Sequence, residues 1–310
     1  MASKPTFATP VLRSATRQNV FRVALSVMSA PLLLLPSIAV LTLVILWPSI
    51  ELLWLSFTNY SPGLGGEFIG LDNYLFILTD RQFLDALVRN VVFVAVVVVL
   101  EVVLGFAIAL LLQYPFPFKK VWLALLLTPF AVSPIVAVAM WKYMLDPTFG
   151  IVNYVFTLLH IQPIMWLTTG DTSMAAIVIV AVWKEFAFTT IIMYAALSTV
   201  PKEMMEAASI DGTNAIQRFV HVTLPLVLPA LVVVTLFRVI FTMREFAIPY
   251  TMTKGGPGTA TEILSIYLYK QAYTYSDYGT GAAVGWIMLI VTLLCSIFLV
   301  RRGYKGMFLE

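Results

Sequence analysis

The sequence predicts an all-α integral membrane protein with six transmembrane helices. Hydrophobic residues make up 60% of its 310 residues and charged residues only 11%, a composition too apolar for a soluble domain whose surface must be wetted. A bilayer core about 30 Å thick is crossed by roughly 20 apolar residues of helix, and six stretches of the chain reach this length. The expected spans are at about 28–55, 90–112, 121–143, 174–197, 230–251 and 279–300, within a membrane domain that covers residues 23–303.

The first of these spans is expected to be a retained helix. Arg13, Arg17 and Arg22 precede its apolar run, as in a signal peptide. The run is, however, much longer than the roughly 7–15 residues of a signal-peptide core.

The loops on the two sides of the expected spans differ in charge. Lys and Arg concentrate in the cytoplasmic loops of membrane proteins, and one alternating set of connections carries eleven of them against five on the other side. The richer set consists of an N-terminal arm at residues 1–22, the second and fourth connections, and a tail at 301–310. Both termini are therefore predicted to be cytoplasmic.

Few residues outside the spans suggest chemistry. The single cysteine, Cys295, lies in the last expected span, so no disulfide can form within the chain. His160 and His221 have no partner at the spacing of metal ligands, and no phosphate-binding loop of the form GxxxxGK[ST] is present. We expect no metal site, no catalytic residue, no nucleic-acid binding and no ATP hydrolysis by this chain alone.

The fourth connection, residues 200–229, differs from an ordinary loop. Pro201 suits the first turn of a helix, and Glu203 and Glu206 add negative charge near its start, where it is favourable. Gly212 can adopt the left-handed conformation that ends a helix. We expect a short helix that projects into the cytoplasm.

A second short helix is expected directly after this stop. Thr213 can cap a helix over about 214–222, and Pro225 would prevent its continuation. Such a compact projection requires a partner surface. Small residues would allow close approach and larger apolar residues would be buried in the contact: Ala207, Ala208 and Gly212 in the first group, and Met204, Met205 and Phe219 in the second.

The spacing of residues in this segment resembles a known signature. The segment reads Glu206-Ala207-Ala208, three residues, Gly212, nine residues, Val222, one residue and Leu224-Pro225. It resembles the cytoplasmic signature of binding-protein-dependent ABC importer permeases, EAA, three residues, G, nine residues, I, one residue and LP, with Val in place of Ile. Segments 68–74, 255–257 and 261–269 are similar to carbohydrate permeases related to the maltose and glycerol-phosphate systems.

The resemblance implies a coupling helix between the fourth and fifth spans, which docks into a groove on an ATP-hydrolysing subunit. Glu206 would pair with a basic group of that subunit, and Gly212 would set the angle of the projection. The coupling contacts would come from Glu203, Glu206, Ala207, Ala208, Asp211, Gly212, Leu224 and Pro225.

The resemblance also implies a complex. Two ATP-hydrolysing subunits would hold ATP and Mg, whereas this chain would bind no cofactor. A second, different permease would complete the pathway, and an extracytoplasmic sugar-binding protein would contact the outer loops at 62–80 and 255–260. The chain would be a multi-pass protein among the lipids of the bacterial inner membrane.

Six ionisable residues lie within the expected spans, where such groups are costly and face the bundle interior or an aqueous path. They are Glu101, Lys184, Glu185, Arg238, Arg244 and Glu245. Lys184 and Glu185 point about 100° apart on a helix and cannot face one partner. Pairs between helices, such as Glu185 with Arg238 or Arg244, are favoured.

Two interpretations of these charges compete. Ion pairs that fix helix packing are favoured for Glu101 and Arg238. A substrate pathway is the alternative for Trp183, Lys184, Glu185, Arg244 and Glu245, because a sugar offers apolar faces and many hydroxyl groups.

Two other function classes are weighed against an ABC permease. An ion-gradient-driven secondary transporter could use the charges within the membrane as an ion relay. The cytoplasmic signature and the six spans, which suit half of a transporter, count against it. A membrane-bound enzyme finds no support, because the loops carry no metal-ligand spacing and no nucleophile motif.

Overall fold

The computed structural model describes residues 34–305. The predicted arm at 1–22, the start of the first span at 28 and residues 306–310 of the predicted tail lie outside these residues. The chain separates into two compact units, residues 1–54 and 55–310. The described residues are helical apart from their loops, and the β pairing among them is confined to two isolated bridges in the loop at residues 58–68.

The described part of the first unit is one apolar helix, Leu34–Leu55, which ends at the boundary with the second unit. It contains a π-helical turn, η1 (Thr42–Leu46), followed by α2 (Trp47–Leu55). Its large apolar side chains are exposed, as in a helix that faces lipid.

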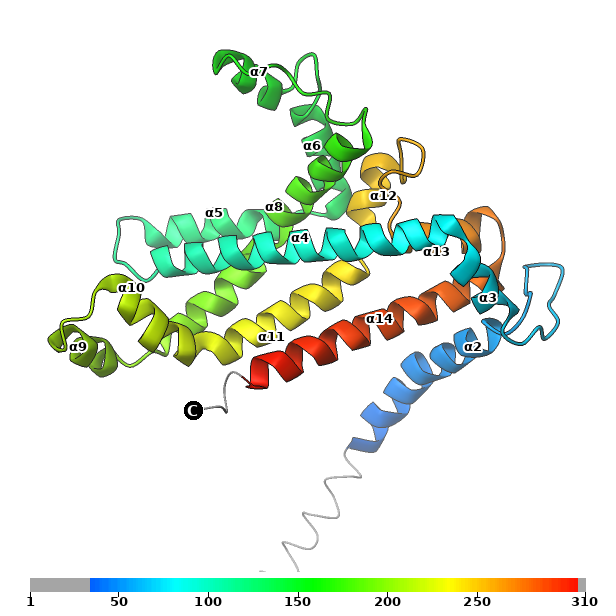
Figure 1. Ribbon diagram of the computed structural model, residues 1–310, viewed down its shortest axis with the longest axis horizontal. Coiled ribbons are helices and arrows are strands. Elements are labelled where there is room, and N and C mark those ends of the chain that lie inside the picture. The colour runs from blue at the N-terminus through cyan, green and yellow to red at the C-terminus, as the bar shows by residue number, and fades with distance from the viewer. Residues whose placement is uncertain (1–33, 306–310) are drawn as a thin grey trace, which may run out of the picture. The chain divides into compact units, whose positions relative to one another are not determined.

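The second unit is a bundle of long helices with short helices at both ends (Figure 1). Its elements are α3 (Asp72–Thr79), α4 (Arg81–Leu111), α5 (Lys119–Ala131), α6 (Pro134–Met144), α7 (Ile151–Leu158), α8 (Gly170–Ser198), α9 (Lys202–Ile210), α10 (Ala215–Arg218), η2 (Phe219–Thr223), α11 (Leu224–Met243), α12 (Ala247–Thr253), α13 (Leu264–Tyr269), η3 (Lys270–Thr274) and α14 (Tyr278–Lys305). The two ends differ in Figure 1: α9 and α10 lie at one end of the long helices, and α3, α12 and α13 lie at the other.

Helices α4, α8 and α11 enclose the core of this unit. Phe93 and Val97 of α4, Ile177 and Val180 of α8 and Met243 of α11 belong to one buried cluster. Close approach of α4 and α8 depends on Gly105, because a Cβ there would lie 2.7 Å from the Cβ of Thr189. This is the small-residue contact that lets helix backbones pack tightly in a membrane.

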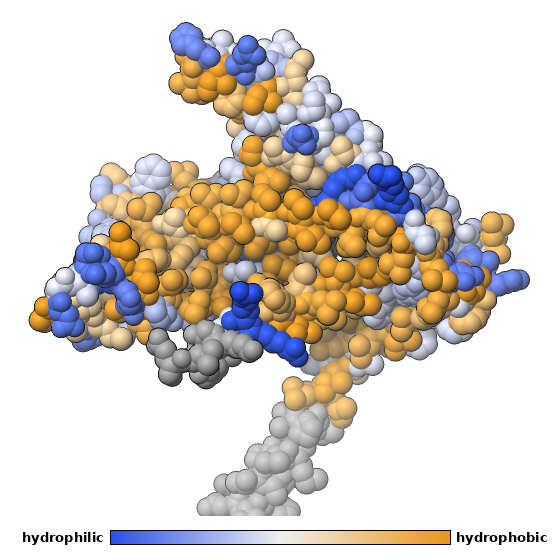
Figure 2. Space-filling view, in the orientation of Figure 1, coloured by the Kyte–Doolittle hydropathy of each residue, from blue (hydrophilic) through white to orange (hydrophobic). Residues whose placement is uncertain are grey.

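The outer surface of the bundle is apolar. Figure 2 shows hydrophobic side chains over the outward sides of α4 and α14 and hydrophilic residues gathered toward the ends of the bundle. Among residues 34–305, five helices are long and apolar enough to cross a membrane, or six if α5 and α6 form one broken span. The expectation of a multi-pass all-α membrane protein is confirmed.

The third span departs from the straight helix expected at 121–143. Helices α5 and α6 meet at an angle of 101°. Val132 is extended between them, and Pro134 occupies the first turn of α6. Proline restricts the residue before it to non-helical backbone and cannot donate a helical hydrogen bond, so the chain turns at this point.

Two other spans have different bounds from those expected. The second begins at Arg81 instead of 90, because the carboxylate of Asp80 accepts the N–H of Gln82 and caps α4 there. The fifth, expected at 230–251, is a helix over Ala215–Met243 that ends before α12 begins at Ala247.

The prediction that Pro225 stops the second cytoplasmic helix is wrong. The chain stays helical because a π-helical turn, η2, precedes the proline, with the N–H of Leu224 bonded to the carbonyl of Phe219. This wider turn accommodates a residue that lacks an N–H and whose ring would clash with the preceding turn. Pro225 therefore lies in the first turn of α11.

Candidate functional site

A charged cavity of about 410 Å³ opens between α4, α8, α11 and the break that follows α11. Its polar lining includes both members of a buried ion pair and three further charged side chains. The lining residues are Val97, Glu101, Phe130, Ala181, Glu185, Arg238, Phe241, Thr242, Arg244, Glu245 and Ile248.

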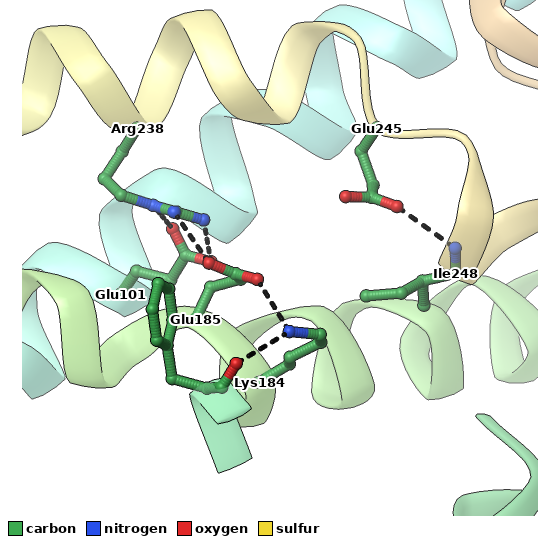
Figure 3. A network of polar contacts seen from close by, with 7 residues as sticks. Glu101, Lys184, Glu185, Arg238, Glu245 and Ile248 are labelled. Carbon is green, nitrogen blue, oxygen red and sulfur yellow. Dashed lines mark hydrogen bonds and ion pairs between the residues drawn. The ribbon is translucent and has the colours of Figure 1, made fainter. Parts of the chain in front are cut away.

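An ion pair between α4 and α11 forms one wall of this cavity (Figure 3). The guanidinium of Arg238 donates through Nε and Nη2 to the two carboxylate oxygens of Glu101, at 2.5 and 2.7 Å. Both side chains are buried. Two parallel charge-assisted hydrogen bonds in an apolar environment fix the relative position of the two helices.

The network continues onto α8. Arg238 Nη1 donates to Glu185 Oε2 at 3.2 Å, which confirms the expected pair between these helices. The other oxygen, Glu185 Oε1, accepts from Lys184 Nζ at 3.2 Å. Lys184 also donates to the backbone carbonyl of Phe130 on α5, at 3.4 Å. Two carboxylates and two cations on three helices, α4, α8 and α11, thus balance one another.

Arg244 and Glu245 differ from these four residues. They lie in the break between α11 and α12, and among the described residues neither forms an ion pair. Glu245 Oε1 accepts the N–H of Ile248 at 3.1 Å, as Figure 3 shows, and the guanidinium of Arg244 lies 5.4 Å from the ring centre of Phe241. Both charges remain available to a molecule in the cavity.

Of the five residues expected in a substrate pathway, the structure places Glu185, Arg244 and Glu245 in the lining of this cavity. Lys184 is buried behind Glu185. Trp183 points elsewhere, because its ring packs edge-on against Trp141 at 5.6 Å beside an apolar surface of α4 and α8. Trp183 and Glu185 are two positions apart on α8, about 200° around the helix, so Trp183 faces away from the cavity that Glu185 lines.

Three polar lining residues were not assigned to the pathway from the sequence. Glu101 and Arg238 were expected only to pair, yet they also face the cavity. Thr242 contributes a buried hydroxyl that has no hydrogen-bond partner among the described residues. The sequence signal that could have assigned Thr242 to the cavity was its position, as a small polar residue two positions before Arg244.

A second feature is an exposed projection, here called the knob, formed by α9, residues 211–214 and α10. The turn after α9 has a Schellman geometry: Gly212 donates to the carbonyl of Ser209 and Thr213 to that of Ala208, both at 3.2 Å. Gly212 has φ +76°, the left-handed conformation expected from the sequence. The two helices of the knob are therefore held by a turn that favours glycine.

The cap of the second helix is not the expected one. Asn214, rather than Thr213, is the N-cap of α10. Its side chain accepts the N–H of Gln217, and the Gln217 side chain accepts the N–H of Asn214, both at 2.9 Å. The hydroxyl of Thr213 instead donates to the carbonyl of Ala208 at 2.5 Å.

The residues expected to couple the knob to a partner occupy different positions. Glu203, Glu206, Ala207, Asp211 and Gly212 are exposed, whereas Ala208 is buried under the turn. Leu224 and Pro225 lie below the knob, at the start of α11.

The apolar contact area of the knob differs in part from that expected, although Met204 is exposed as predicted. Phe219 packs against Phe106 of α4, with ring centres 5.8 Å apart, and Met205 is half-buried against Thr223. The large apolar side chains at the tip are Ile210 and Ile216, 86% and 75% exposed. Two isoleucines this exposed on a small projection are typical of a protein contact.

Comparison with known proteins decides the family. The family described as "Binding-protein-dependent transport system inner membrane component" matches residues 101–304. The chain belongs to this family. It is therefore a non-catalytic, multi-pass permease subunit of an ABC importer, and the secondary transporter is not favoured.

The permease has relatives over most of its length. It is 34% identical over 273 residues to the trehalose/maltose transport system permease protein of Thermococcus litoralis, covering 88% of this chain and 92% of the relative. It is 33% identical over 274 residues to the sulfoquinovosyl glycerol transport system permease protein of Agrobacterium fabrum, covering 88% and 89%.

The permease also shares its fold with a solved structure. A chain in a bacterial alginate ABC transporter, in complex with an alginate pentasaccharide-bound periplasmic protein, superimposes with a TM-score of 0.80 at 19% identity. The match covers 94% of this permease and 98% of that chain.

Proposed function

We propose that this permease forms half of a translocation pathway for a carbohydrate, which an extracytoplasmic binding protein delivers and ATP hydrolysis in separate subunits drives. The named relatives transport trehalose or maltose and sulfoquinovosyl glycerol. The charged cavity suits such ligands, because it combines Phe130 and Phe241 with carboxylate, guanidinium and hydroxyl groups.

The knob carries the coupling part of the proposal. It presents exposed carboxylates at Glu203, Glu206 and Asp211 beside Ile210 and Ile216, on a turn fixed by a Schellman geometry. Apolar residues surrounded by charge are the composition of a protein contact with a buried centre and a polar rim. The partner would be an ATP-hydrolysing subunit, with Glu206 paired to one of its basic groups.

Motion of the knob would reach the cavity through one continuous helix. The segment Ala215–Met243 joins the second helix of the knob to Arg238 without a break. A rigid-body movement of the knob would therefore shift Arg238 relative to Glu101 and Glu185, which opens and closes the pathway by alternating access.

The complex would contain further members. A second, different permease would supply the other half of the pathway, and two ATP-hydrolysing subunits would hold ATP and Mg, with no cofactor on this chain. Both termini and the knob would be cytoplasmic, and the loops at 62–80 and 255–260 would contact the binding protein on the outer side.

Uptake by the complete complex in proteoliposomes tests this function. With ATP enclosed, uptake of trehalose, maltose, maltotriose or sulfoquinovosyl glycerol is expected to require the binding protein and to persist when ionophores collapse the proton and sodium gradients. Uptake that stops with the ionophores and continues without ATP would establish ion-driven transport instead.

A further inference from the structure

Six aromatic rings form a continuous series between the break that follows α11 and the loop at residues 58–68. In order from the break they are Phe246, Tyr250, Tyr269, Tyr273, Tyr278 and Tyr60. Successive ring centres lie 4.7, 4.8, 5.2, 5.8 and 6.3 Å apart, all within the range of direct aromatic contact. We call this series the aromatic track.

The six rings of the track lie on six elements of the chain. Phe246 lies in the break after α11, Tyr250 on α12, Tyr269 on α13, Tyr273 on η3, Tyr278 at the start of α14 and Tyr60 in the loop before α3. These parts belong to the end of the bundle that lies opposite the knob in Figure 1.

The rings are not a buried core. Tyr273 is 63% exposed, and the other five rings are half-buried. Five of the six are tyrosines, so the series offers hydroxyl groups beside apolar ring surface. Tyrosines in mutual contact that keep part of their surface exposed provide both apolar and hydrogen-bonding character.

Both ends of the track meet regions assigned above. At the inner end, Phe246 follows Glu245, which lines the charged cavity. At the outer end, the carbonyl of Tyr60 accepts the N–H of Tyr278 at 3.1 Å, which holds the loop against α14. Tyr60 lies two residues before the loop at 62–80, which is proposed to contact the binding protein.

We propose that the aromatic track guides a ring-containing carbohydrate from the binding protein to the charged cavity. A sugar ring has C–H faces that pack on aromatic rings and hydroxyl edges that bond to tyrosine hydroxyls. If each ring binds the sugar with similar affinity, no single position holds the ligand too tightly for it to move to the next ring. This inference rests on the proposed function and adds the route and the ring chemistry of the substrate.

An aromatic belt at the membrane interface is the competing explanation, since tyrosine is enriched there. A belt requires only that each ring meets the interface. It does not require rings from six elements of the chain to contact one another in one series that begins next to a residue of the cavity lining.

Tyr275 provides a matched control. It lies two residues from Tyr273 and is 60% exposed, but it takes part in none of the ring contacts among the described residues. If the rings only anchor the protein at the interface, replacing either tyrosine should affect uptake equally. A track instead predicts an effect on uptake for Tyr273 and none for Tyr275.

The test uses the complete complex in proteoliposomes, with uptake of trehalose, maltose, maltotriose and sulfoquinovosyl glycerol measured beside ATP hydrolysis. Tyr269→Leu and Tyr273→Leu are expected to lower uptake about fivefold, on the order of one lost aromatic contact. Stimulation of ATP hydrolysis by the loaded binding protein should remain. Tyr273→Phe should retain most of the uptake, and Tyr275→Leu all of it.

The other outcomes overturn the track. Equal losses for Tyr273→Leu and Tyr275→Leu would establish an interface belt, and unchanged uptake would remove any role in transport. If the Tyr269→Leu or Tyr273→Leu complex loses the second permease during purification, the rings form a contact between subunits and are not a route for the sugar. Wild-type vesicles that take up none of the four sugars, while ATP hydrolysis still responds to the binding protein, would instead contradict the carbohydrate assignment itself.

Discussion

Arg238 on α11 and Glu101 on α4 lie 137 positions apart in the chain and form a bidentate ion pair at 2.5 and 2.7 Å, buried from solvent. The two partners are not equivalent. Arg238 has a second carboxylate, Glu185, whereas the hydrogen bonds of the Glu101 carboxylate within the described residues come from Arg238 alone. Loss of Arg238 therefore leaves the buried carboxylate of Glu101 without a partner, whereas loss of Glu101 leaves Arg238 paired with Glu185.

Arg238→Met is accordingly expected to destabilise the permease more than Glu101→Gln. Removing one partner of a buried ion pair costs about 3–5 kcal/mol, and Arg238→Met should fall at the upper end because Glu101 is left unpaired. The measurement is the thermal unfolding midpoint of the purified permease in nanodiscs.

The double variant Glu101→Gln with Arg238→Met completes this cycle. It should be more stable than Arg238→Met, because no uncompensated charge remains. Arg244→Met, which breaks no ion pair, serves as the control and should leave the midpoint unchanged. Additive losses in the double variant would show that the two residues are not coupled.

The conformation of Gly212 gives a prediction for the knob. At φ +76° a β-branched residue is strongly disfavoured, whereas asparagine tolerates the left-handed region. An added Cβ would meet nothing within 4 Å, so the effect comes from the backbone alone. Gly212→Val should lower the affinity for the ATP-hydrolysing subunit by about 5–30-fold, the effect of 1–2 kcal/mol of strain.

Gly212→Asn is the matched variant and should bind nearly as well as the wild type. Biolayer interferometry with the permease in nanodiscs measures both affinities. Equal weakening by Val and Asn would show that side-chain size at position 212 matters and the backbone conformation does not.

Tight packing of α4 on α8 gives a third prediction. Gly105→Ala would place a methyl group 2.7 Å from the Cβ of Thr189 and is expected to cost about 1–3 kcal/mol through overpacking. Ala107→Val adds apolar volume on an exposed part of the same helix and should change little. Thermal unfolding in detergent compares the two variants, and an unaffected Gly105→Ala protein would mean that α4 and α8 can separate at this point.

The proposed orientation is testable through the single cysteine of the chain. In a Cys295→Ala background, a cysteine at Lys202 should react with a membrane-impermeant maleimide only in inside-out vesicles. A cysteine at Leu64, which is 89% exposed in the opposite loop region, should react only in right-side-out cells. Labelling of both positions from the same side would contradict the positive-inside assignment on which the orientation rests.

The sequence predicted those features that depend on local chemistry. Gly212 was expected to end a helix in the left-handed conformation and does so, because few other residues adopt φ +76° easily. Arg238 was one of the two partners expected for Glu185, beside Arg244, because buried charges of opposite sign on neighbouring helices must find partners.

Features that depend on tertiary packing were missed or wrong. Which face of α8 turns inward is decided by its packing on α4 and α11, and this packing leaves Trp183 outside the lining of the charged cavity. Pro225 has an unambiguous local preference against helix, yet the π-helical turn before it removes the conflict. The pattern Asn214-x-x-Gln217, in contrast, was a readable capping box that was overlooked in favour of Thr213.

The most direct test of the central claim measures ATP hydrolysis by the complete complex in lipid, with and without the sugar-loaded binding protein. The comparison is between the wild type and a knob variant with Glu206→Ala, Ile210→Ser and Ile216→Ser, with helix content checked by circular dichroism. Stimulation of hydrolysis by the binding protein is expected in the wild type and should be lost in the knob variant at unchanged helix content. Equal stimulation in both proteins would contradict coupling through the knob.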